Sequence, residues 1–265
     1  MPDIIDLIKN WWKQMFAVVM LSLLAVGIIT FLKPRQYLSV ATAVPASSVA
    51  ADKSKIFNEN IQALYSTLGS PDDLDMILGT ASLDTVYLSV TDQFNLFDHY
   101  KISNKDSIAR TKAATRLKGN TKVMKSEYGE LKVKIWDTDK SLAPQLANAI
   151  MDKLQLIHQN LQSAGNEATL KGLMAGKQKL QTQLDTTANN SSLQGRLQQY
   201  EKLIGEYQLM VDSKPPSLIM VEKAKVSVQP DRPKRMQIMI ATALLSFLFA
   251  LFAALVMERR KTLSK

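Results

Sequence analysis

Two apolar stretches decide how this chain is organised: Gln14–Leu32, QMFAVVMLSLLAVGIITFL, and Met236–Met257, MQIMIATALLSFLFALFAALVM. Neither contains a charged residue, and each has the length, about 20 residues, that a helix needs to cross a bilayer. We predict two transmembrane helices, residues 14–32 and 236–257, which tether one polar domain, residues 33–235, at both of its ends. Residues 1–13 and 258–265 flank the two spans.

Composition limits the classes of partner. The formal charge is +9, and residues 34–235 carry 26 Lys and Arg against 21 Asp and Glu. This mild positive charge suits an anionic membrane surface or an acidic glycan. No cluster of cations alternates with aromatic residues, so nucleic acid is not an expected partner. The chain has no cysteine, which excludes disulfide bonds and thiolate metal sites. Asp3 and Asp6 precede the first span, which favours a retained anchor over a cleaved signal peptide.

The polar domain combines strand and helix patterns. Alternating and β-branched residues predict strands at Tyr37–Val44, Thr121–Glu127, Glu130–Trp136 and Ser217–Val228, with a turn at Tyr128-Gly129 between the middle two. Apolar spacings of three and four predict helices at Asp52–Leu68, from Pro71, within Leu83–Phe97, and at Asn104–Leu117. Because the first and last strands each adjoin a span, we expect them to lie close together.

The longest helical pattern covers about residues 139–212. Apolar residues recur from Leu142 to Leu184, break near residues 187–192, and resume from Leu193 to Val211 with coiled-coil-like spacing. The predicted fold is α+β: a membrane-proximal α/β base with long projecting helical arms, flanked by two transmembrane helices. One such rod has a wide apolar stripe and little partner surface, which predicts a homo-oligomer.

No arrangement of residues indicates catalysis. The two histidines, His99 and His158, lie far apart in the sequence and have no second ligand at metal-binding spacing, so we read both as structural or surface residues. Asp137-Thr138-Asp139 has the carboxylates of a metal-dependent sugar transferase, but it also suits the N-cap of the long helix, which is the interpretation we adopt. We predict no enzyme activity, cofactor or metal.

Small residues recur at four-residue spacing in the second span, at Thr242, Ser246, Ala250 and Ala254. A face of this kind lets membrane helices approach closely. Together with Pro230, Pro233 and Lys234, which precede the span, these residues are the candidate sites for membrane packing or partner contact.

Several stretches resemble the Wzz family of polysaccharide co-polymerases, which includes the O-antigen chain-length determinants. Ile5–Lys13 with the first span and Tyr37–Pro45 resemble the family's first span and first strand. Glu130–Leu154 resembles its strand followed by D-x-D and A-x-x-x-A-N, and Leu218–Arg235 its proline-rich approach, with a matching Pro233-Lys234 pair. Where the family places prolines this chain has Ala224 and Ser227, and where it places glycines it has Ser246 and Ala250.

The resemblance implies an inner-membrane protein with cytoplasmic termini and a periplasmic domain. It implies homo-oligomeric rings, a membrane O-antigen polymerase and lipid-linked glycan as partners, and control of glycan length without chemistry of its own. A capsule or exopolysaccharide export adaptor, working with a separate tyrosine kinase and an outer-membrane exporter, is the alternative. A two-span sensor is a third hypothesis, which the eight residues after Met257 make less suitable.

Overall fold

The computed structural model describes residues 4–46, 71–102, 106–186 and 191–263. They form two compact units. The membrane-helix unit comprises Met1–Leu38, Thr138–Lys140 and Ser227–Lys265, and the soluble unit comprises Ser39–Asp137 and Ser141–Val226.

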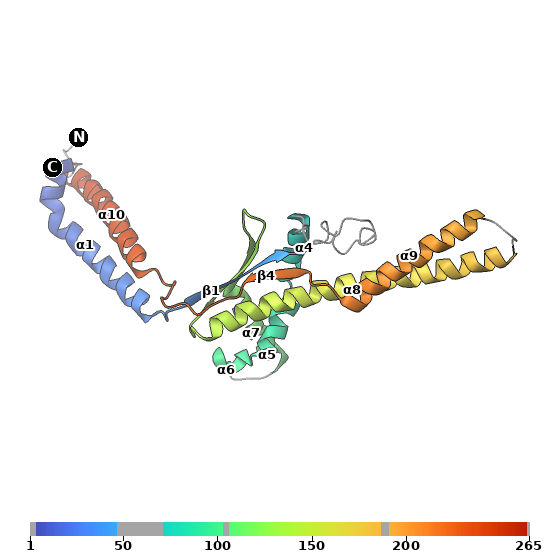
Figure 1. Cartoon of the computed structure of the whole chain (residues 1–265). Coiled ribbons are helices and arrows are strands. Elements are labelled where there is room, and N and C mark those ends of the chain that lie inside the picture. Colours follow the sequence, from blue (N-terminus) through green and yellow to red (C-terminus); the bar gives the residue numbers. More distant parts are fainter. Residues whose placement is uncertain (1–3, 47–70, 103–105, 187–190, 264–265) are drawn as a thin grey trace. The chain divides into compact units, whose positions relative to one another are not determined.

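Two long helices make up most of the membrane-helix unit. Helices α1 (Ile4–Leu32) and α10 (Arg235–Leu263) lie side by side and place both chain termini at the same end of the pair (Figure 1). Among the described residues, Ile8–Leu32 and Arg235–Arg259 are each long and apolar enough to cross a membrane. Only 11% and 17% of their most apolar windows are buried, which distinguishes them from core helices of a soluble protein. Helix α1 begins ten residues before the predicted span.

A four-stranded sheet with the order β2-β3-β1-β4 forms one layer of the soluble unit. Its strands are β1 (Tyr37–Pro45), β2 (Thr121–Lys125), β3 (Leu131–Asp137) and β4 (Leu218–Glu222). Strands β2 and β3 form the predicted hairpin, with Val123 opposite Val133. Gly129 in the connecting turn has φ +75°, a conformation that favours glycine. The first and last strands do pair: β1 and β4 are antiparallel, with Val44 opposite Ile219.

The last strand is shorter than its sequence pattern. Alternation continues to Val228, but β4 ends at Glu222. Beyond it, side chains replace the ladder: Ala224 N–H donates to Asn148 Oδ1 at 2.8 Å, and Ser39 Oγ donates to Lys225 O at 2.7 Å. Alternation alone does not reveal that these backbone groups bond to side chains.

Among the described residues, four short helices follow the first strand: α4 (Pro71–Ala81), α5 (Asp84–Gln93), α6 (Leu96–His99) and α7 (Ser107–Gly119). Pro71 opens α4 as predicted, since its missing N–H is no loss at a first helical position. Helix α7 begins later than Asn104, because Asp106 is its N-cap and its Oδ1 accepts from Ala109 N–H at 2.7 Å. The predicted helix at Asp52–Leu68 lies outside the described residues.

The hydrophobic core lies where α8 (Leu142–Thr186) crosses the sheet and contacts α4 and α5. Alternate residues of β3 point into it, and Leu131 and Ile135 are fully buried. Leu146 and Ile150, four apart on α8, are also fully buried. Each such side chain contributes roughly 1.5–3 kcal/mol of transfer free energy, so this core holds the base together.

The distal part of α8 leaves this core and pairs with α9 (Ser191–Ser213), as Figure 1 shows. Lys177 Nζ and Glu201 Oε1 lie 2.9 Å apart across the pair. Only α9 packs along this part of α8 within the described residues, so we call the pair the rod. The predicted α+β class with two long apolar helices at its ends is confirmed.

Candidate functional site

The membrane helices pack through the small residues of α10. Ala250 and Ala254 are each 3% exposed and form an apolar cluster with Met15 of α1. Ser246 is buried and Thr242 half-buried, and their hydroxyls donate to carbonyls of their own helix, those of Ala243 and Ile238. The candidate face therefore contacts α1 of the same chain. Its contact with another protein stays a prediction.

Polar contacts join the helices at both ends. Trp11 Nε1 donates to Glu258 Oε2 at 2.8 Å near the chain termini. At the opposite end the Arg235 guanidinium lies 4.5 Å from the centroid of the Phe31 ring, a cation–π contact. The helix pair is thus held as an antiparallel hairpin along its length.

Two linkers meet at that second end, the one after α1 and the one before α10. Gln36 N–H donates to Arg232 O at 2.9 Å, and Asp231 N–H donates to Gln36 O at 2.9 Å. The predicted site residues Pro230, Pro233 and Lys234 line a cavity here with Arg35, of about 550 Å³. The structure brings these three together and places Thr242, Ser246, Ala250 and Ala254 on the helix face beyond.

The A-x-x-x-A-N motif at the start of α8 holds the segment that follows β4. Ala143 and Ala147 are fully buried, which lets α8 pack closely on the sheet. The side chain of Asn148 contacts Ala224 twice, accepting from its N–H at 2.8 Å and reaching its carbonyl oxygen at 3.5 Å. Proline has no N–H, so alanine at position 224 permits a bond that the proline expected from the resemblance cannot make.

Asp137 is not the predicted helix cap. It is the last residue of β3 and is 1% exposed, and Asp137 Oδ1 lies 2.8 Å from His99 Nε2. Helix α8 starts only at Leu142. Burial, and then the nearby Asp137 carboxylate, raise the pKa of Tyr100 to about 12. The Arg116 guanidinium covers the Tyr100 ring at 4.9 Å. The interpretation of His99 as a structural residue fits its contact with the buried Asp137.

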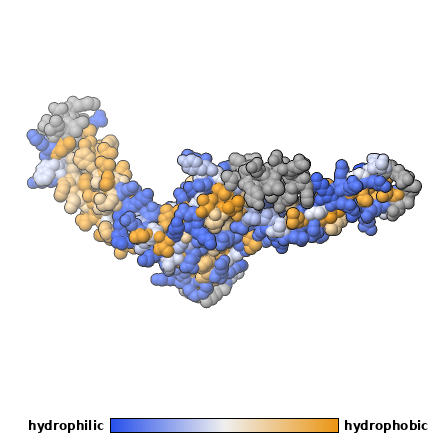
Figure 2. All heavy atoms as spheres, in the orientation of Figure 1, coloured by the Kyte–Doolittle hydropathy of each residue, from blue (hydrophilic) through white to orange (hydrophobic). Residues whose placement is uncertain are grey.

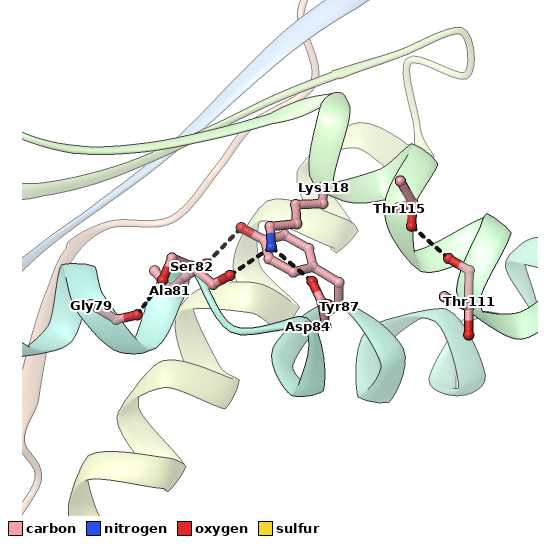
Figure 3. Close-up of polar contacts among 8 residues, drawn as sticks. All are labelled: Gly79, Ala81, Ser82, Asp84, Tyr87, Thr111, Thr115 and Lys118. Atoms are coloured by element: carbon pink, nitrogen blue, oxygen red, sulfur yellow. Dashed lines mark hydrogen bonds and ion pairs between the residues drawn. The ribbon is translucent and has the colours of Figure 1, made fainter.

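A second polar cluster joins the α4–α5 turn to α7 (Figure 3). Lys118 Nζ donates to Ser82 O at 2.6 Å and to Asp84 Oδ1 at 2.7 Å. It also lies 5.7 Å from the centroid of the Tyr87 ring, and Tyr87 Oη donates to Ala81 O at 2.9 Å. Burial, and then the charge of Asp84, raise the pKa of Tyr87. Lys118 and Tyr87 each bond a backbone carbonyl of the α4–α5 turn, which is a structural role.

Apolar side chains remain exposed on two surfaces of the soluble unit. On β4, an edge strand, Ile219 is 48% and Val221 58% exposed. Along the rod, Tyr200 and Ile204 are only half-buried. Figure 2 shows apolar residues over the membrane helices and in smaller patches over the soluble unit. These surfaces offer area to another protein rather than a reactive group.

No group of three or more His, Cys, Asp or Glu in the described part of the chain is arranged to hold a metal ion. The sequence motifs identified the residues of the linkers and of the α8 base, but not two features. The pairing of His99 with Asp137 joins residues 38 apart, and no local pattern signals it. The second is the cluster of cations around Lys234. Arg35 is far from Lys234 in the sequence, and the two come together only because Gln36 pairs with Arg232.

Known proteins resemble this chain in structure but not detectably in sequence. No family model matches the sequence, and no curated protein matches it either. A full-length bacterial polysaccharide co-polymerase is similar in structure, with 13% identity, a TM-score of 0.42, and 99% of this chain and 98% of that chain covered. A fragment of WzzB, a polysaccharide co-polymerase from Salmonella Typhimurium, is similar with 13% identity and a TM-score of 0.35, over 75% of this chain and 100% of that one. Both are described as polysaccharide co-polymerases.

Proposed function

We propose that this chain is a non-enzymatic, oligomeric regulator of the length of a bacterial surface polysaccharide, the O-antigen. It would sit in the inner membrane with both termini cytoplasmic and residues 33–235 periplasmic, and act beside a membrane glycan polymerase on lipid-linked glycan. The sequence motifs supply the family, and the architecture supplies a physical reason for the role.

One observation carries the proposal: both ends of the domain are held at one place. Strands β1 and β4 pair, the linkers meet at Gln36 and Arg232, and α1 packs on α10. A domain tethered in this way is attached to the membrane at both of its ends. It is suited to organising other proteins in the membrane rather than to reaching a distant partner.

The exposed apolar surfaces support the proposed oligomer. Ile219 and Val221 lie on an edge strand, and the rod carries a half-buried apolar stripe. Edge strands and apolar faces of this kind are covered in stable proteins. Neighbouring copies in a ring would cover them, and the ring would give a growing glycan a repeated surface of defined extent.

Surface lipopolysaccharide from cells with and without the protein tests the role directly. Deletion should convert a modal ladder on a gel into a broad distribution of lengths. An unchanged ladder with loss of secreted polymer, or a co-purifying tyrosine kinase, would instead support the export adaptor.

Ala250→Leu tests the membrane hairpin within this proposal. Leucine at the 3%-exposed position 250 would push α1 away, so we expect a widened or lost modal length. Ala241→Leu, at an exposed position of the same helix, is the matched control and should keep the ladder. Immunoblots of membrane fractions show whether both variants reach normal levels. Normal ladders from both would remove the packing role of Ala250.

A further inference from the structure

The cavity between the two linkers is lined mainly by cations. Arg35 lies three residues beyond α1, while Arg232, Lys234 and Arg235 lie at or just before the start of α10. All four line the cavity, against one carboxylate, that of Asp231. One carboxylate does not balance four cations, so the hollow has a net positive charge that favours an anion.

The walls of the cavity are fixed by backbone contacts. Besides the bonds between Gln36 and the segment Asp231-Arg232, Arg235 N–H donates to Pro233 O at 2.9 Å. The Arg235 side chain is placed by its contact with the Phe31 ring. The backbone that carries the cations is therefore held in place before binding, which costs less ordering than a flexible basic tail. The side chains of Arg35, Arg232 and Lys234 are exposed.

The position of the cavity selects the kind of anion. It lies at the end of both membrane helices, where lipid headgroups are found. Its remaining wall includes Met236, which belongs to the apolar span and is 76% exposed. A lining that combines four cations with an exposed apolar side chain suits an amphiphile better than a soluble ion. A volume of about 550 Å³ gives room for a small headgroup.

We propose that this cavity binds the phosphate headgroup of an anionic membrane phospholipid, of the phosphatidylglycerol class. Arg35 and Lys234 supply charge from the two linkers, and neither forms an ion pair among the described residues. The bound lipid would fix where the hairpin sits relative to the bilayer surface. The inference does not depend on the proposed control of glycan length.

Native mass spectrometry of the full-length protein, released from bilayers of phosphatidylcholine and phosphatidylglycerol, tests the site. Wild-type protein should retain phosphatidylglycerol in preference to phosphatidylcholine. Arg35→Gln should lower its retention about fivefold, the effect of one cationic contact near a membrane. Lys234→Gln on the other linker should do the same, which keeps the test valid if one variant folds poorly.

Lys33→Gln is the matched control, because Lys33 is exposed, lies two residues from Arg35 and does not line the cavity. It should change retention less than twofold. Equal losses from Lys33→Gln and Arg35→Gln would show diffuse charge attraction and overturn the site. Displacement of the lipid by millimolar inorganic phosphate would overturn the lipid assignment in favour of a soluble anion. Because no glycan is present, this result is independent of the lipopolysaccharide gel.

Discussion

The two halves of α8 belong to one unbroken helix but differ sharply in their surroundings. From Ala143 to Leu154 the helix buries side chains on several sides, against the sheet and against α4 and α5. From Gln159 to Leu184 only Leu170 and Leu180 are buried, and the packing partner is α9. Helix propensity continues across both halves, so the difference lies in tertiary packing. The stability of the fold is therefore concentrated in the base, and the rod is the part with surface left for neighbours.

The largest expected loss of stability comes from comparing one leucine-to-alanine substitution in each half of α8. Leu146→Ala removes a fully buried side chain of the base and should cost about 3 kcal/mol or more. Leu180→Ala, in a two-helix environment that can collapse more easily, should cost about half as much. Thermal unfolding of the full-length variants in detergent gives the two shifts. Equal losses would mean that the rod is as tightly packed as the base.

The next prediction concerns the hydrogen bond between Asn148 and Ala224, which holds the segment after β4 against α8. Ala224→Pro removes the N–H that Asn148 Oδ1 accepts, and should cost about 1–2 kcal/mol. Asn148→Ala removes the same bond from the other side. In a double-mutant cycle the proline should cost much less once Asn148 is gone. Additive losses would show that the two residues act separately.

A third prediction concerns His158, which is 2% exposed near the point where the base gives way to the rod. Burial lowers the pKa of His158 from its usual 6.5. The unfolded chain then binds a proton at higher pH than the folded chain, so stability is lost as the pH falls below about 6.5 and is regained above it.

His158→Gln removes this linkage while keeping a polar side chain. The difference in unfolding midpoint between wild type and variant should therefore shift in favour of the variant between pH 7.5 and pH 5.5. His99→Gln provides a comparison at the other histidine. A difference between wild type and His158→Gln that is the same at both pH values would mean that the imidazole has the same pKa in the folded and the unfolded chain, so that burial does not shift it.

Sequence patterns predicted the elements that bury one face and expose the other. The rod residues Leu170, Leu180 and Tyr200 were expected on its apolar seam, and all are buried or half-buried. Patterns failed where a distant partner decides the structure. Asp137 has the residue type of a helix cap, yet His99 binds it at the end of β3. The alternation after Glu222 was read as strand, yet Asn148 binds Ala224 there. In the candidate site, Lys234 was recognised from its motif, whereas the cavity depends on the meeting of two linkers 196 residues apart at Gln36 and Arg232.

The smallest effects compare two glycines of the rod, Gly172 and Gly176, one turn apart on α8. Glycine in a helix interior costs about 1 kcal/mol relative to alanine. A Cβ at Gly172 would meet nothing within 4 Å, so Gly172→Ala should stabilise the rod by about that amount. A Cβ at Gly176 would lie 2.6 Å from Tyr200 Cε1, so Gly176→Ala should gain less or lose stability.

Hydrogen exchange resolved along α8 separates these outcomes from effects on the base. Gly172→Ala should slow exchange from Gln159 to Leu184 and leave Ala143–Leu154 unchanged, because the two halves open separately. Gly176→Ala should slow it less, and Tyr200→Leu should restore part of the gain by removing the ring that obstructs the new methyl group. Equal protection in both glycine variants would mean that α9 lies further from α8 than the contact at Tyr200 indicates. A change that spread into Ala143–Leu154 would mean that base and rod unfold as one unit, which would remove the contrast between the two halves of the helix.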